Sequence, residues 1–120
     1  MTGVIRLSDF RGRHRRIFFS RPELNQLLSL YSRQVARGEW RDYAIDQRDG
    51  VASFSVFRHT HETALYTIVK MAPSTSRHGD YVVLHRHHRL AGGDALNEVL
   101  AILQRKLGRA LIPFEGESAR

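Results

Sequence analysis

The stretch from Trp40 to Arg58 constrains the fold most strongly, because it has the pattern of a β-hairpin. Two runs rich in aromatic and β-branched residues, 40–46 and 51–58, flank an Asp-Gly pair that can adopt the positive φ angles of a tight reversal. The second run alternates between an apolar face and a mixed face, with Ala52, Phe54 and Val56 on one and Val51, Ser53, Ser55 and Phe57 on the other. The hairpin is therefore expected to be half of a packed antiparallel sheet.

An amphipathic helix is predicted before the hairpin. Ser20 and Glu23 form a capping-box pattern with Pro22 in the first turn, and Gly38 supplies the left-handed residue that ends the helix. The apolar positions follow helical spacing and predict one core-facing stripe: Leu24, Leu27, Leu28, Tyr31 and Val35. Tyr31 is expected to be a core residue rather than a catalytic phenol.

The rest of the chain supplies further strands and a second helix. Short apolar runs predict strands at 17–19, 64–71 and 81–85, with a loop at 72–80. The segment 86–91 is expected to be a turn with a short continuation that Gly92 and Gly93 break. Asp94 is a candidate N-cap for the second helix, and Gly108 is placed to end it. The stripe of that helix is Leu96, Val99, Leu100, Leu103 and Leu107.

These elements predict an α+β two-layer sandwich. An antiparallel meander of four to five strands carries two amphipathic helices on one face, in the order β-α-β-β-β-β-α. The expected organisation is a flexible leader at 1–12, a single domain at 13–112 and a disordered tail at 113–120.

The overall charge favours an acidic partner. The chain contains nineteen Lys and Arg residues and twelve Asp and Glu residues, which gives a net charge of +7. Only two of the nineteen basic residues, Lys70 and Lys106, are lysines. Arginine is suited to bidentate recognition of phosphate and carboxylate, although high-GC coding would also favour arginine over lysine. The chain has no cysteine, no membrane-length apolar run and no apolar core of a signal peptide near its start, so a soluble cytoplasmic protein is expected.

One basic tract precedes the first predicted strand. Arg13, Arg15 and Arg16 could form a phosphate-facing arm of a nucleic-acid binder, or they could protect a sheet edge from pairing. Basic and aromatic residues also interleave at 40–43 and 57–59, a composition that can hold phosphates and stack bases. The signatures of RNA-recognition motifs, helix-turn-helix domains and zinc fingers are absent.

The histidines are weak candidates for a metal site. His59 and His61 follow one predicted strand, while His85 and His87 would share a face of another, with His88 beside them. The sequence offers only Glu62 or Asp80 as a further ligand, and surface histidines are the simpler explanation. No metal, no cofactor and no catalytic residue are expected.

Several runs of this sequence resemble an uncharacterised family. They are 39–46, 54–58, 65–68 and the Leu-Tyr-Ser-Arg segment at 30–33, with the run Gly-Glu-Trp-Arg-Asp-Tyr at 38–43 the most specific. The resemblance covers Arg16 to about Leu107 and is to a mainly alphaproteobacterial family catalogued as domain of unknown function 2794. It implies no activity, substrate or catalytic residue.

The resemblance directs attention to the residues around Trp40. Trp40 could fill the junction between the first helix and the sheet, or it could join Arg41, Tyr43 and Arg58 in an exposed recognition patch. The sequence therefore favours a non-enzymatic binding or regulatory module of the bacterial cytoplasm that contacts nucleic acid or the ribosome. One alternative is a protein-interaction or homo-oligomerising domain that uses a sheet edge or the patch around Trp40, with a homodimer through a sheet edge as one form of it. The other is a histidine-dependent metal-binding protein or enzyme. No membrane partner is expected.

Overall fold

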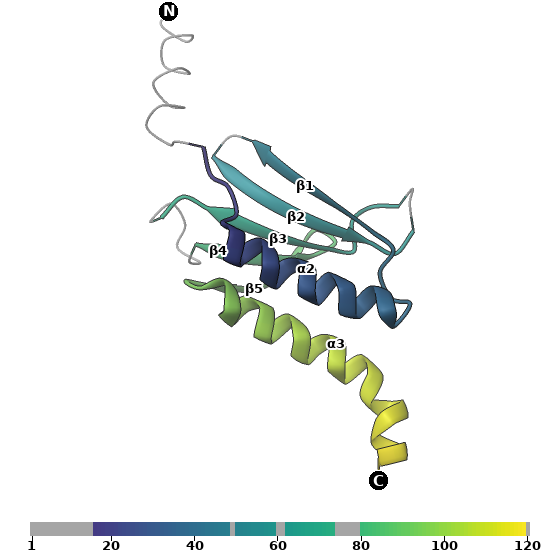
Figure 1. Cartoon of the computed structure of the whole chain (residues 1–120). Helices are drawn as coiled ribbons and strands as arrows, with labels where there is room; N and C mark the ends of the chain where they lie inside the picture. The colour runs from purple at the N-terminus through teal and green to yellow at the C-terminus, as the bar shows by residue number, and fades with distance from the viewer. Residues whose placement is uncertain (1–15, 49, 60–61, 74–79, 120) are drawn as a thin grey trace, which may run out of the picture.

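Five antiparallel strands form one sheet and follow each other in chain order. In the computed structural model they are β1 (Asp42–Arg48), β2 (Val51–Phe57), β3 (Tyr66–Met71), β4 (Tyr81–His85) and β5 (His88–Gly93). Helices α2 (Arg21–Ala36) and α3 (Leu96–Ala119) lie on the same face of the sheet (Figure 1). The structure describes residues 16–48, 50–59, 62–73 and 80–119, with side chains up to Gly108. The expected α+β architecture is confirmed.

The central hairpin forms where it was predicted, although its first strand ends at Arg48 instead of residue 46. Arg48 pairs with Val51, and Gly50 has a φ of +81°, a conformation that favours glycine. The alternation along β2 is also confirmed, since Ala52, Phe54 and Val56 are buried while their neighbours are half-buried.

Two details of the predicted order are wrong. Residues 17–19 form no strand, because this segment leads directly into α2 and its Phe18 carbonyl accepts a bond of 2.8 Å from the Lys70 ammonium instead of a ladder partner. The fifth strand comes from His88–Gly93, where Gly92 and Gly93 continue the strand rather than break it. A Cβ on Gly93 would lie 2.8 Å from the Glu98 carboxylate and 3.4 Å from a methyl group of Val99, so α3 approaches this strand closely, although the exposed Glu98 side chain could move aside. The described order is therefore α-β-β-β-β-β-α.

The second helix is longer than expected. It begins at Leu96, continues past Gly108 and ends at Ala119, so Gly108 does not end it. The division into a leader, a domain at 13–112 and a tail stays a prediction, and residues 1–12 and 74–79 lie outside the described part. No helix in that part is long and apolar enough to cross a membrane.

Helix α2 is turned relative to the predicted stripe. The residues it buries most deeply are Leu27, Leu30 and Gln34, whereas Val35 is 41% exposed. The remaining predicted stripe residues Leu24, Leu28 and Tyr31 are only partly buried. Tyr31 contacts Tyr43 with ring centroids 4.8 Å apart, which places this side of the helix toward β1. Helix α3 follows its predicted stripe, with Leu96, Val99, Leu100 and Leu103 buried.

A polar network fastens the start of α2 to the sheet. One Glu23 carboxylate oxygen accepts bonds from the Ser20 amide and the Lys70 ammonium, both at 2.7 Å, and the other accepts from the Tyr81 hydroxyl. The Ser20 hydroxyl accepts from the Glu23 amide, which completes the predicted capping box. Burial raises the pKa of Glu23, but these hydrogen bonds outweigh it, so the pKa lies below its usual value. Burial and the bond to Glu23 raise the pKa of Tyr81.

The variant Glu23→Gln tests this network. Glutamine retains an oxygen for the Ser20 amide but leaves Lys70 without its counter-charge, so we expect a loss of about 1–3 kcal/mol in the free energy of unfolding at neutral pH. Because the folded pKa of Glu23 is lowered, its contribution is present above the unfolded pKa and disappears as pH falls through the folded pKa.

Urea unfolding of both proteins between pH 7 and strongly acidic pH checks this expectation. The difference between wild type and variant should shrink on acidification. A difference that stayed constant with pH would mean that the ionised carboxylate contributes nothing. The double variant with Lys70→Met, in a mutant cycle, isolates the coupling between the two side chains.

Candidate functional site

The order of the sheet gathers arginine and histidine residues at one of its ends. In an antiparallel meander, the starts of β1, β3 and β5 lie beside the ends of β2 and β4, and here α2 also ends on that side. We call this the basic end and define it by Arg37, Arg41, Arg58, Arg86 and Arg89 with His59, His85, His87 and His88. Segments far apart in the sequence thus contribute to one surface.

The carboxylates at the basic end neutralise only part of its charge. Glu39 binds Arg58 at 2.8 Å, while Glu62 lies 4.0 Å from His59. Asp42 accepts a bond of 2.8 Å from the Tyr43 amide. In the described part of the chain, no carboxylate lies within 4.0 Å of the guanidinium groups of Arg37, Arg41, Arg86 and Arg89. All four side chains are exposed, so they can accept an anionic partner.

Arg86 occupies an unfavourable backbone conformation. Its φ of +58° makes it the only described non-glycine residue with a positive φ, in the tight turn between β4 and β5. The left-handed region costs a residue with a Cβ about 1–2 kcal/mol, and such strain concentrates at functional sites. Arg86 therefore carries a positive charge at the tip of a turn whose backbone would suit glycine better.

A chain of aromatic rings supports the basic end from inside. Ring centroids are 6.4 Å apart between Tyr31 and Trp40, 6.0 Å between Trp40 and Tyr66, and 4.9 Å between Tyr66 and His85. Burial raises the pKa of Tyr66, although Arg58 and Arg86 act in the opposite direction. These contacts connect α2 to β3 and β4 just below the exposed arginines.

Trp40 belongs to this support and not to an exposed patch. It is only 3% exposed and its amide donates to the Gln34 carbonyl behind Gly38, whose φ is +79°. The structure thus favours the first alternative, in which Trp40 fills the junction of helix and sheet. Of its three proposed neighbours, Arg41 is exposed, Arg58 is paired with Glu39, and Tyr43 is 40% exposed on the helix-covered face.

The basic tract before α2 does not join this surface. Arg16 precedes Phe18, whose carbonyl binds Lys70, at the opposite end of the sheet. The 16 residues of α2 span about 24 Å between that end and Arg37. Arg13 and Arg15 lie outside the described residues. A single surface containing Arg16, Arg41 and Arg58 is therefore not what the structure shows.

The histidines do not gather into a metal-binding set. Within the described ranges, no group of three His, Asp or Glu side chains could hold an ion. His85 stacks on Tyr66 on the helix-covered face, whereas the register of β1 places Asp42 on the other face. His87 is exposed in the hairpin turn, His59 is near Glu62 alone, and His61 lies outside the described residues.

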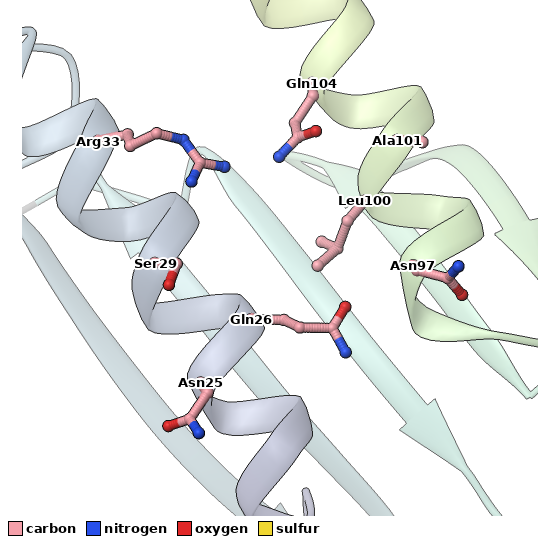
Figure 2. A pocket seen from close by; sticks show the side chains of 8 residues that line it. All are labelled: Asn25, Gln26, Ser29, Arg33, Asn97, Leu100, Ala101 and Gln104. Carbon is pink, nitrogen blue, oxygen red and sulfur yellow. The ribbon is translucent and has the colours of Figure 1, made fainter.

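A groove between the two helices is the second candidate site. This groove of about 340 Å³ is lined by Asn25, Gln26, Ser29, Arg33, Asn97, Leu100, Ala101 and Gln104. Figure 2 shows Gln26, Arg33 and Gln104 reaching into the gap, while Asn25 and Asn97 point away from it. The lining residues include one cation, several amides and no carboxylate, so the groove accepts hydrogen bonds and negative charge. It was not identified from the sequence, because its residues look like the ordinary polar sides of two helices.

The fold and these two features define a small α+β protein with a basic end and a polar groove between its helices. The chain belongs to the family described as protein of unknown function (DUF2794), whose model matches residues 17–100. This match confirms the resemblance found in the sequence. No curated protein and no solved structure matches the chain.

The strained turn gives a prediction that separates stability from function. Arg86→Gly relieves the left-handed conformation at some cost in unfolded-chain entropy, so we expect the protein to become more stable by roughly 0.5–1 kcal/mol. The matched control is His87→Gly in the same turn, which relieves no positive φ and should not stabilise the protein. Urea unfolding of the three proteins checks this, and equal changes in the two variants would contradict it.

Proposed function

We propose that this protein is a non-enzymatic nucleic-acid-binding module of the bacterial cytoplasm, and that the basic end is the surface that contacts the phosphate backbone. The observation that supports it most is that Arg41, Arg86 and Arg89, none paired with a described carboxylate, all lie at one end of the sheet. Phosphate contacts from guanidinium groups supply most of the sequence-independent affinity of such proteins.

The geometry suits an extended backbone better than a small ligand. The arginines come from β1, from the turn after β4 and from β5, which are at opposite edges of the sheet. Adjacent strands are about 4.8 Å apart, so the two edges of five strands are separated by roughly 19 Å. Guanidinium groups spread over this distance can contact several phosphates along one strand, whereas a small ligand would reach only some of them.

Four histidines extend this surface. His59, His85, His87 and His88 lie at the same end, and all four are exposed. Imidazole rings can donate hydrogen bonds to phosphates and stack on bases, whereas the guanidinium groups supply the electrostatic attraction in this proposal.

The main test compares two triple variants with the same change in charge. Arg41→Ala, Arg86→Ala and Arg89→Ala remove the basic end, whereas Arg13→Ala, Arg15→Ala and Arg16→Ala remove the tract before α2. We expect the first variant to weaken binding to labelled single-stranded RNA by about tenfold or more, and to reduce the slope of log K against log salt by about two.

Fluorescence anisotropy measures both quantities from 50 to 300 mM salt, with single-stranded and duplex DNA as further probes. If only the variant in the N-terminal tract lost affinity, the basic end would be the wrong surface. If wild type bound none of the probes at about 150 mM salt, the nucleic-acid proposal itself would fail. Circular dichroism of each variant establishes that the fold is retained.

A further inference from the structure

The free edge of β1 carries an apolar surface that the helices leave open. Ile45 is 49% exposed and Tyr43 is 40% exposed, and both lie on the face covered elsewhere by α2 and α3. Val35 is 41% exposed and lies one turn after Tyr31, on the side of α2 that contacts Tyr43. Three of the four large hydrophobic residues that are exposed in the described part of the chain therefore flank the outer edge of one strand.

The backbone of this edge is available for pairing. The amides of Tyr43 and Gln47 donate to the side chains of the preceding aspartates, Asp42 at 2.8 Å and Asp46 at 2.9 Å, rather than to a strand. Ile45 lies midway between them, and alternate residues of a strand direct their amides to the same side. The amides of Tyr43, Ile45 and Gln47 thus face the free edge, where strand pairing can replace the aspartate bonds.

The other edge of the sheet is much less suited to pairing. The pairing of β4 with β5 shifts between Val83 and Leu84, which leaves Leu90 of β5 without a partner in the register. Strand β5 also ends in two glycines, which offer no side chains to a partner strand. Bulges and arginines such as Arg89 also discourage pairing at an edge. Strand β1 is regular through its seven residues and contains no glycine or proline.

We infer that the occupant of this edge is a second copy of the chain, with two β1 strands pairing antiparallel about a two-fold axis at Ile45. In this register Ile45 opposes itself, Tyr43 opposes Gln47 of the second copy, and Asp42 opposes its Arg48. The ends of the strand are therefore complementary in charge to each other, and the two exposed Ile45 side chains cover one another. The five-stranded sheets join into one of ten strands.

The charges of β1 exclude the neighbouring symmetric registers. A shift that centres the axis on Ala44 places Asp42 against Asp46, and a shift to Asp46 places that residue against itself. Directly opposed like charges destabilise a strand pair. A two-fold axis normal to the sheet also keeps all the helices on one face and points the two basic ends in opposite directions, so dimerisation is compatible with binding at each end.

Sedimentation or light scattering of the full chain across concentration tests this inference. We expect a dimer that Ile45→Lys weakens by about tenfold or more, because two ammonium groups would meet at the axis. The matched control is Phe18→Lys, which should leave the dimer intact. Phe18 is the remaining large hydrophobic residue exposed in the described part of the chain, at 57%, and it lies before the start of α2, away from Ile45 of β1. Ile45 is exposed, so the fold tolerates the change. A monomeric wild type, or a dimer indifferent to Ile45→Lys, would overturn the inference.

Two further variants test the register itself. The chain contains no cysteine, so Ile45→Cys introduces a single thiol that should form an intermolecular disulfide under mild oxidation, while Phe18→Cys reports random crosslinking. Asp42→Arg and Arg48→Asp should each weaken self-association, and an equimolar mixture of the two should recover a heterodimer. Crosslinking no faster than the control, or a mixture that fails to recover association, would show that another surface is used.

Discussion

The Glu23 carboxylate is the interaction on which the layered structure depends. It caps the first turn of α2 through the Ser20 amide and also accepts from Lys70 on β3 and Tyr81 on β4. The same group therefore decides where the helix begins and where it sits on the sheet. Because Lys70 also binds the Phe18 carbonyl, the segment before the helix is held down by its backbone. Apart from the buried amide of Gln34, the other residues that α2 buries most deeply are apolar and pack without directional bonds, so this network contributes most to the direction in which the helix runs.

That direction determines what each end of the sheet contains. Helix α2 begins near Lys70 and ends at the opposite end of the sheet, so Arg37, Trp40 and Arg41 lie at the basic end. The segments that follow β2 and β4 begin at the same end. The aromatic contacts from Tyr31 through Trp40 to Tyr66 then keep the start of β1 and β3 in register beneath the exposed arginines. A basic surface assembled from distant segments thus follows from a single helix orientation and an unbroken meander.

Local patterns predicted the elements well and the placement of polar groups poorly. The capping box, the stop at Gly38 and the hairpin around Gly50 depend on neighbouring residues alone, and all three agree with the structure. The leading strand at 17–19 failed because the partner of its backbone is the Lys70 side chain, about fifty residues away in the sequence. Leu30 and Gln34 were missing from the predicted stripe because the helix is turned so that they are buried, while Tyr31 contacts Tyr43 on the β1 side. The position of Lys70 could have indicated this network, because a lysine on the helix-covered face of a strand needs an acidic or carbonyl partner there.

The candidate site illustrates why binding surfaces are harder to predict than cores. The tract before α2 has the highest local density of arginines in the sequence, yet Arg16 lies at the other end of the sheet from the basic end. The arginines of the basic end are dispersed in the sequence and form one surface only through the strand order. The strained backbone of Arg86 singles out one residue of this surface, but the sequence does not reveal it, because a positive φ is seen only in the structure. Glycine would fit this conformation with less backbone strain, so Arg86 costs the hairpin some stability while it places a positive charge at the tip of the turn.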